Sequence, residues 1–439
     1  MSFLERLFGS NTAVPEPDIR FGRFSDSYHS AAQDAAFGEA VQLFNEGELV
    51  DSYKAFFRYL HNTAEENVRV WDEKGGIGFE LFQGSKRVTG FANDRKFYAE
   101  AKVARANALQ SSFMRRLLDG NFELKYSRFA LTPANEIAIV FDSYPVDGSP
   151  YKLYAALKEL ATHADKHDDL LIDEFEVLEP TEINVRRHLP EAEKEIKYGY
   201  IKREIESAFA VLDDDRLHPG QYALGFTYLL LFLSYKLDYL TKPEGFMMET
   251  LEHIHRMAFA KDGKNVAQKD QAIRREFQKL LDRPKEKFFK EMYEVRATFG
   301  ITTPIDHQKL ALIIEQELPN MKWYLEQGHE QIALAVPGYI ASFSLFYYAL
   351  PGPDKELFHL LLQIIEHAYF EELGFQSFVQ NGKFDKKAIR REIHHIAERH
   401  RKACPKLAPG LNTLVWSSLP QFAESFLLMV RALDLSGCV

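Results

Sequence analysis

The stretch from Asn107 to Asp169 most constrains what this chain can fold into, because its hydrophobic pattern changes period in a fixed order. Phe113 and Leu117 belong to a helical stripe, and Gly120 marks its end. Two runs of period two follow, FELKYSRFAL and IAIVFDSY, and the TPANE turn between them predicts two paired strands. Ser149 before a proline then predicts the start of a second helix.

The first of these strands is expected to begin at Phe122, because Phe122, Leu124 and Tyr126 alternate with polar residues. Upstream, residues 68–103 contain three or four short alternating runs, separated by turn residues such as glycine and asparagine. A helical pattern over residues 49–60 precedes them. The whole segment therefore predicts a small antiparallel sheet packed against helices.

The order of a helix, three or four strands, a helix, two strands and a helix has a known counterpart. With RRLLDGNFELKYSRFAL followed by NEIAIVFDS and an alanine-rich helix, it resembles the YbjN family and the class I type III secretion chaperone fold that this family shares. The resemblance covers about residues 48–170. It implies a module that binds proteins and has no catalytic residues.

The regions on either side of this module are predicted to be helical. Residues 31–62 are similar to one tetratricopeptide-like hairpin, with Gly47 at the turn between two apolar stripes. Residues 1–30 are expected to form an N-terminal arm, residues 63–182 the module, and residues 183–439 an all-helical domain. The expected fold class is α+β and mainly α: a small antiparallel-sheet, chaperone-like module followed by a duplicated all-helical domain.

The duplication is expected at about residues 216–330 and 334–439. QAIRREF at 271–277 resembles KAIRREI at 387–393, LEHIHRM at 251–257 resembles IEHAYFE at 365–371, and the Pro-Gly pair at 219 resembles that at 337. These matches share a separation of about 114 to 118 residues, which one chance match would not produce. We therefore expect two related helical bundles or one array of stacked helices.

Composition disfavours several partners and locations. A formal net charge of -10 disfavours nucleic acid as a partner. The most apolar run, ALGFTYLLLFLSY, is shorter than the roughly 20 residues that cross a bilayer, so we expect a buried helix and no membrane span. Cys404 and Cys438 are the two cysteines of the chain, and they predict no disulfide framework. A reducing compartment follows, and since MSFLERLFGS lacks the pattern of a signal peptide, we expect a cytoplasmic location.

The sequence has no phosphate-binding, zinc-protease, serine-hydrolase or CxxC motif, so we expect no catalytic residue and no cofactor. Candidate protein-binding residues are instead two paired arginines, two residues of the first strand and two tyrosines of the aromatic run FSLFYYAL at 343–350: Arg115, Arg116, Tyr126, Arg128, Tyr347 and Tyr348. Guanidinium groups make forked bonds to carboxylates, although paired arginines more often form an exposed helix face. A helix with rings on several faces is either central or covered by a partner.

A metal-dependent helical enzyme is the alternative. Glu252 with His255, and Glu392 with His395, place a carboxylate and an imidazole on one helix face, as in di-iron bundles. The two pairs do not occupy equivalent positions, because Glu252 aligns with Glu366 in the duplication. Fortuitous pairs are also expected in a chain with 15 histidines.

Together these patterns favour a non-enzymatic adaptor or chaperone-like protein of the bacterial cytoplasm. We expect it to bind a protein partner through the sheet face or exposed helix of the module and through grooves between the C-terminal helices. The metal-dependent enzyme and a structural subunit of a larger assembly, as a homo-oligomer or with other proteins, are the alternatives.

Overall fold

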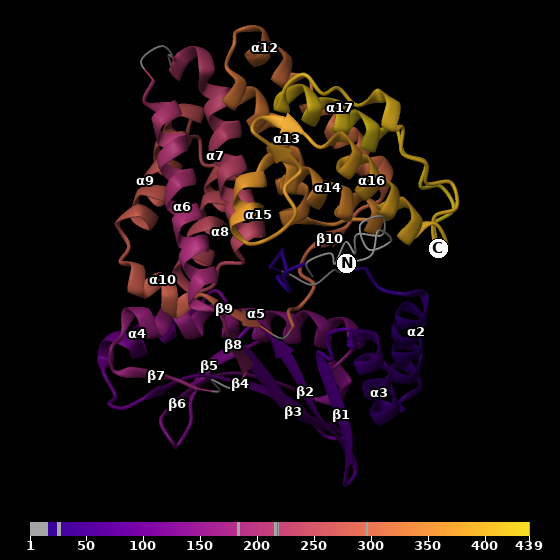
Figure 1. The fold of residues 1–439 in the computed structure, drawn as a ribbon. Coiled ribbons are helices and arrows are strands. Elements are labelled where there is room, and N and C mark those ends of the chain that lie inside the picture. Colours follow the sequence, from indigo (N-terminus) through magenta and orange to yellow (C-terminus); the bar gives the residue numbers. More distant parts are fainter. Residues whose placement is uncertain are drawn as a thin grey trace, which may run out of the picture.

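The computed structural model describes residues 16–23, 28–181, 185–214, 217, 219–295 and 297–438 (Figure 1). An antiparallel sheet lies in the N-terminal half, and a larger body of helices stacks on one side of it. The predicted fold class, α+β and mainly α, is confirmed. Of the expected N-terminal arm, residues 1–15 and 24–27 lie outside the described residues.

A helical hairpin precedes the sheet, formed by α2 (Ala31–Glu46) and α3 (Leu49–Leu60). The Ser30 side chain accepts from the Gln33 backbone, and the Gln33 side chain accepts from the Ser30 backbone, which is a capping box. Gly47 ends α2 with a φ of 86°, a left-handed conformation that glycine adopts without steric cost. The glycine turn predicted from the sequence is therefore present.

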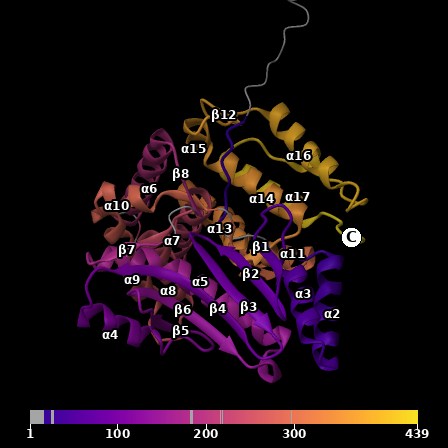
Figure 2. The ribbon, with the colours of Figure 1, turned by 90° about the horizontal axis from the view of Figure 1, so that it is seen from below.

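The sheet has seven strands, in the order β1-β2-β3-β4-β6-β5 with β7 paired to β4. These strands are β1 (Val68–Glu73), β2 (Gly76–Gln83), β3 (Lys86–Asn93), β4 (Phe97–Ala106), β5 (Arg128–Leu131), β6 (Glu136–Ser143) and β7 (Leu178–Pro180). The helix α4 (Ser111–Gly120) precedes β5, and the one-turn η1 (Pro145–Asp147) leads into α5 (Pro150–Glu174). Along α5 one side packs on the sheet, and seen from below the strands lie in front of the helical body (Figure 2).

The strand expected to begin at Phe122 is shorter than predicted, because it begins at Arg128. The carboxylate of Glu159 on α5 accepts hydrogen bonds from the backbone N–H groups of Lys125, Tyr126 and Ser127 at 2.8 to 2.9 Å. These donors are satisfied by a side chain and not by a neighbouring strand. Phe122 is 92% exposed, so the alternation that predicted a half-buried strand is not used for burial.

The helical domain follows the sheet. It contains α6 (Glu191–Leu212), α7 (Pro219–Thr241), α8 (Gly245–Phe259), α9 (Val266–Asp282), α10 (Lys285–Glu291), α11 (His307–Glu317), α12 (Asn320–Glu326), α13 (Glu330–Tyr347), α14 (Gly352–Ile365), α15 (His367–Glu372), α16 (Lys386–His400), η3 (Leu411–Thr413) and α17 (Leu419–Arg431). Short two-stranded pairs join β8 (Arg186–His188) to β9 (Tyr293–Val295), β10 (Thr303–Pro304) to β11 (Tyr348–Ala349), and β12 (Val379–Gln380) to β13 (Lys383–Phe384). No helix in the described part of the chain is long and apolar enough to span a membrane.

The core of the helical domain is built around α7 and α13, which run parallel to each other. Tyr228 on α7 contacts Tyr339 on α13, and seven residues later Tyr235 contacts Phe343, with ring centroids 5.3 and 5.4 Å apart. A Cβ atom on Gly338 would lie 2.5 Å from the Phe232 ring, so this position admits no side chain without movement. The predicted duplication would pair these two helices, and their Pro-Gly dipeptides differ in place: Pro219 begins α7, whereas Pro337 lies inside α13.

A network of buried ionic side chains joins the sheet module to the helical domain. Asp168 on α5 lies 3.0 Å from the Lys86 ammonium, and both side chains have no exposed area. The same carboxylate accepts from Arg186 on β8, whose guanidinium stacks over the Tyr293 ring on β9. Nearby, Asp165 accepts from the backbone N–H of Ser85 at 2.7 Å, and burial raises the pKa of Asp165 to about 7. Buried charges are tolerated here because most have a partner.

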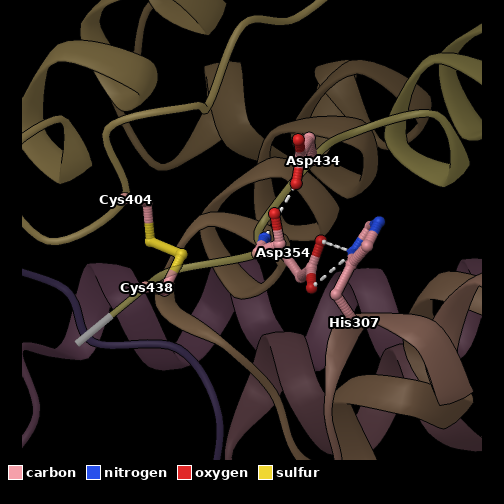
Figure 3. Close-up of a disulfide and its surroundings, with 6 residues drawn as sticks. His307, Asp354, Cys404, Asp434 and Cys438 are labelled. Carbon is pink, nitrogen blue, oxygen red and sulfur yellow. Dashed lines mark hydrogen bonds and ion pairs between the residues drawn. A yellow bond between two sulfur atoms is a disulfide. The ribbon is translucent and has the colours of Figure 1, made fainter.

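The sequence predicts no disulfide framework, but the structure contains one disulfide. Cys404, just after α16, and Cys438, near the end of the described chain, form a disulfide (Figure 3). The segment after α17 returns to the end of α16, where Lys406 donates to the Ser436 hydroxyl at 3.0 Å. A separation of 34 residues gave no sign in the sequence that the two sulfur atoms meet.

Candidate protein-binding cleft

A cavity of about 1050 Å³ lies between the helical hairpin and the edge of the sheet. Its walls come from the start of α2, one side of α3, the 61–67 connection, strand β1, Tyr154 on α5 and residues 298–300. The hairpin stands beside β1 in both ribbon views (Figures 1 and 2). The cleft is therefore shaped by segments that are far apart in the sequence.

Strand β1 forms one edge of the sheet and pairs with β2 alone within the described chain. The N–H of Phe82 donates to the carbonyl of Asn67 at 2.8 Å, which sets the alternation of the antiparallel ladder. Because every second residue turns its backbone groups to its neighbour, Val68, Val70 and Asp72 turn their N–H and C=O groups away from β2. These three residues also line the cleft, so the cleft borders an open strand edge.

The opposite edge of the sheet, formed by β5, is partly covered by a side chain. On β5 the backbone N–H of Phe129 points outward and donates to the side-chain carbonyl of Asn121 at 2.7 Å. A side chain thus occupies a donor that another strand would otherwise reach. The outward N–H groups of Val70 and Asp72 donate no comparable hydrogen bond to an acceptor on a described residue. The two edges of the sheet therefore differ in their readiness to accept a strand.

The floor of the cleft is apolar and its rim is polar. Phe57 and Leu60 on α3, together with Val68 on β1, are buried beneath the opening, while Val70 is 39% exposed. At the rim, the Lys54 ammonium lies 2.8 Å from the Asp72 carboxylate and joins α3 to β1. An extended polypeptide alternates its side chains, so apolar residues on one face fit this floor.

Polar side chains hold the wall of the cleft that the start of α2 and the end of α3 form. The Gln33 amide donates to the carbonyls of Tyr59 and His61, both at 3.1 Å, which holds the start of α2 against the end of α3. The His29 ring lies 4.4 Å from the Tyr59 ring, and burial lowers the pKa of His29. A neutral imidazole at physiological pH adds no charge to this wall.

The remaining wall comes from the helical half of the chain. The N–H of Gly84, in the β2–β3 turn, donates to the carbonyl of Ala297 at 2.8 Å, and the side chain of Gln83 accepts from the N–H of Phe299. The Phe299 ring lies 6.0 Å from the Tyr154 ring on α5. Backbone and ring contacts thus position residues 298–300 at the cleft.

The residues predicted to bind a partner lie elsewhere and are not brought together in one site. Arg115 and Arg116 are on α4, where the Arg116 guanidinium lies 3.8 Å from the Glu174 carboxylate. Tyr126 is in the loop whose backbone binds Glu159, and the Arg128 guanidinium lies 2.6 Å from the Asp142 carboxylate. Tyr347 is the last residue of α13, and Tyr348 is the first residue of β11. None of the six lines the cleft. The signal that was missed is the run VRVWDE, a short edge strand directly after the hairpin.

The pairs proposed as metal ligands have other contacts. Glu252 lies 3.0 Å from the buried Arg23 guanidinium, and the His255 Nδ1 atom hydrogen-bonds the Tyr235 hydroxyl at 2.7 Å. Burial lowers the pKa of His255, and rings of α13 surround it. Glu392 and His395 lie 3.3 Å apart on the exposed side of α16. The described residues contain no group of three or more side chains that could hold a metal ion.

The chain matches no protein-family model, and no curated protein has a significantly similar sequence. The geometry of the cleft and its open strand edge therefore carries the functional argument by itself.

Proposed function

We propose that this protein is a non-enzymatic adaptor or chaperone-like protein that binds an extended segment of a partner protein in the cleft beside β1. The segment adds to the sheet as a further strand along the outward groups of Val68, Val70 and Asp72. The observation that carries the proposal is the open edge of β1 bordering a cavity of about 1050 Å³. Strand addition to a sheet edge is a recurring mode of peptide recognition.

Two features support a peptide over a small molecule. Main-chain hydrogen bonds to an edge strand give affinity for any extended backbone, and alternate side chains give specificity. The floor around Phe57 and Leu60 is apolar, whereas the Lys54–Asp72 ion pair stands at the rim. This arrangement suits a segment with apolar residues at every second position. The resemblance of residues 48–170 to secretion chaperones and YbjN proteins agrees with a role in binding proteins.

The test uses a single substitution that removes one outward donor. Val70→Pro deletes the N–H that faces the open edge, while the ladder to β2 uses the backbone groups of Arg69 and Trp71. Proline is tolerated on edge strands when its missing N–H faces outward. Peptides of about 12 residues are selected from a random display library on the full chain, and their affinities are measured by fluorescence anisotropy. We expect Val70→Pro to lower the affinity of the selected peptides by tenfold or more.

Leu131→Pro is the matched control, because Leu131 turns its N–H outward at the opposite edge on β5. This variant should bind the selected peptides as well as the parent protein does. Hydrogen exchange gives an independent readout: bound peptide should slow exchange at Val70 and Asp72. Equal binding by the two proline variants, or unchanged exchange at β1, would refute strand addition at this site.

The cellular location has opposing indications. The cytoplasmic location expected from the sequence is a reducing one, whereas disulfides persist mainly in oxidising compartments. We propose the cytoplasm, with Cys404 and Cys438 reduced until the protein meets an oxidant. Thiol labelling of the protein in intact host cells decides the matter, because two labelled cysteines support the cytoplasm and none contradicts it.

A further inference from the structure

The helix α16 and its flanking residues concentrate positive charge in an acidic chain. Residues 383–402 contain eight lysines and arginines against three aspartates and glutamates, whereas the whole chain has a formal net charge of -10. Six of the eight cations are exposed and form no ion pair or hydrogen bond with the described residues: Lys383, Lys386, Lys387, Arg390, Arg391 and Lys402. We call these six side chains the basic face.

The spacing of the residues on α16 separates an inner side from an outer side. Its apolar residues are buried in the helical domain: Ala388, Ile389, Ile393, Ile396 and Ala397. Lys387 and Arg391 are four residues apart, so they lie one above the other on the outer side. The helix has 15 residues and is about 22 Å long. It lies at the outer edge of the helical body (Figure 2), so the basic face is a row of cations that meets solvent.

The related run on α9 uses its cations within the fold. The guanidinium of Arg274 forks onto the Asp213 carboxylate, with both N–O distances 2.6 Å. The Lys269 ammonium donates to the carbonyls of Ala258 and Ala260 at 2.9 and 2.7 Å. The cations of the basic face have no such partner among the described residues, so the stability of the fold does not account for them.

A tryptophan and an exposed apolar side chain border the basic face. The Lys386 ammonium and the Arg390 guanidinium each lie 5.6 Å from the centroid of the Trp416 ring. The neighbouring Val415 is 43% exposed, and its backbone N–H donates to the Ser425 hydroxyl at 2.9 Å, which fixes its position. Cations beside a tryptophan and an exposed apolar side chain are typical of proteins that lie on anionic membrane surfaces.

Two other kinds of anionic partner fit this surface less well. Proteins that bind single-stranded nucleic acid offer aromatic rings for stacking, but two cations cover the Trp416 ring, which also packs against Phe384 and Phe422. A protein interface has an apolar centre, and the exposed residues of α16 are all polar. A flat anionic bilayer needs neither feature and attracts all the cations of the row at once.

We propose that the basic face docks this protein on the surface of a membrane that contains anionic phospholipids. The cations bind the head groups and Val415 inserts among them. The negative charge of the rest of the chain does not prevent docking, because salt at physiological concentration screens such charges beyond about 8 Å. The basic face is separate from the cleft beside β1, which takes no wall from α16.

Flotation of the full chain with lipid vesicles tests the proposal. The protein should bind vesicles of equal parts phosphatidylserine and phosphatidylcholine, with an affinity that falls as salt is added, and should not bind vesicles of phosphatidylcholine alone. Each cation near an anionic bilayer contributes about fivefold to binding, so the Lys387→Gln, Arg391→Gln double variant should bind about 25-fold more weakly. Val415→Ser should weaken binding by about threefold or more, because it removes apolar contact without changing a charge.

The Lys261→Gln, Arg275→Gln double variant is the matched control. Both side chains are exposed, and Arg275 on α9 has the place in its run that Arg391 has on α16. In Figure 1, α9 and α16 lie on opposite sides of the helical body, so this variant should bind vesicles as the parent protein does. Polyuridylate and polyglutamate, at the same concentration of negative charge, represent the other partners. Absence of binding to anionic vesicles, an equal loss in the control, or tighter binding of either polymer would overturn the proposal.

Discussion

The close approach of α7 and α13 can be tested at a single position, Gly338. Replacing Gly338 with alanine adds one methyl group that would lie 2.5 to 2.7 Å from three atoms of the Phe232 ring. Ordinary carbon contacts are about 3.5 to 4.0 Å, so the overlap is about 1 Å on each atom. Either the ring or the helix must move to admit the methyl group.

Two opposing effects determine how much Gly338→Ala changes the free energy of unfolding. Alanine is favoured over glycine within a helix by about 1 kcal/mol, because the unfolded glycine chain has more freedom to lose. Overpacking a well-filled core costs about 1 to 3 kcal/mol. We therefore expect Gly338→Ala to lower the free energy of unfolding by as much as about 2 kcal/mol.

Gly199 on α6 isolates the steric term. A Cβ atom there would meet only the far end of the Arg203 side chain, at 3.3 Å, which can move aside. Gly199→Ala should therefore raise the free energy of unfolding by about 0.5 to 1 kcal/mol. The difference between the two alanine variants, about 1 to 3 kcal/mol or more, measures the contact between α7 and α13.

Urea denaturation followed by far-UV circular dichroism provides the comparison, with the slope of the transition checked in each variant. The combination of Gly338→Ala with Phe232→Leu adds a second criterion: leucine lacks the clashing ring atoms, so the double variant should be more stable than the two single changes predict. Equal stabilisation by Gly338→Ala and Gly199→Ala would show that the helices are not in close contact at this point.

Three further outcomes are expected. Burial raises the pKa of Asp165 to about 7, so between about pH 4 and 7 its carboxyl keeps its proton in the folded protein and loses it in the unfolded chain. The free energy of unfolding should therefore fall as the pH rises through this range and then level off. Asp165→Asn should remove this part of the pH dependence, a difference on the order of 3 to 4 kcal/mol measured by urea titration. Reduction of the Cys404–Cys438 disulfide, whose cysteines are 34 residues apart, should lower the free energy of unfolding by about 4 kcal/mol, because the unfolded chain gains conformational entropy. An unchanged free energy of unfolding would show that the bond does not form in solution. Glu159→Ala leaves three backbone donors without their acceptor, so limited proteolysis should cut residues 122–127 faster, and an unchanged rate would contradict the assigned role.

Local signals in the sequence identified many of the elements. Ser149 accepts from the Lys152 backbone as the N-cap of α5, and Pro150 takes the first position, as the dipeptide predicted. The run over residues 49–60 coincides with α3, and Gly47 makes the predicted turn. These features depend on residues within one or two turns of each other, which is the range over which a sequence pattern is informative.

The departures depend on residues distant in sequence. The pattern of Phe122, Leu124 and Tyr126 is typical of a strand, but a carboxylate more than 30 positions later, on Glu159, binds the backbone that would have formed it. Cys404 and Cys438 meet only because the segment after α17 folds back. Hydrogen bonding and chain reversal of this kind leave no periodicity in the sequence.

The candidate site escaped prediction for a related reason. Each predicted binding residue was chosen for its chemistry, as in the paired arginines at Arg115 and Arg116. The cleft instead depends on backbone groups of β1, which every residue has, and on the direction in which they point. Whether a strand is at an edge is decided by the whole sheet, so composition alone could not identify Val70 as a residue of an open strand edge.

The wall at residues 298–300 also has a consequence for biosynthesis. A ribosome completes the sheet strands β1 to β6 long before it reaches Phe299, so the nascent module begins with a cleft that is open on one side. The cleft reaches its final shape only after the chain past residue 300 has emerged and docked against Gln83 and Gly84. Fragments that end before residue 298 contain the open edge of β1 but lack one wall of the cleft.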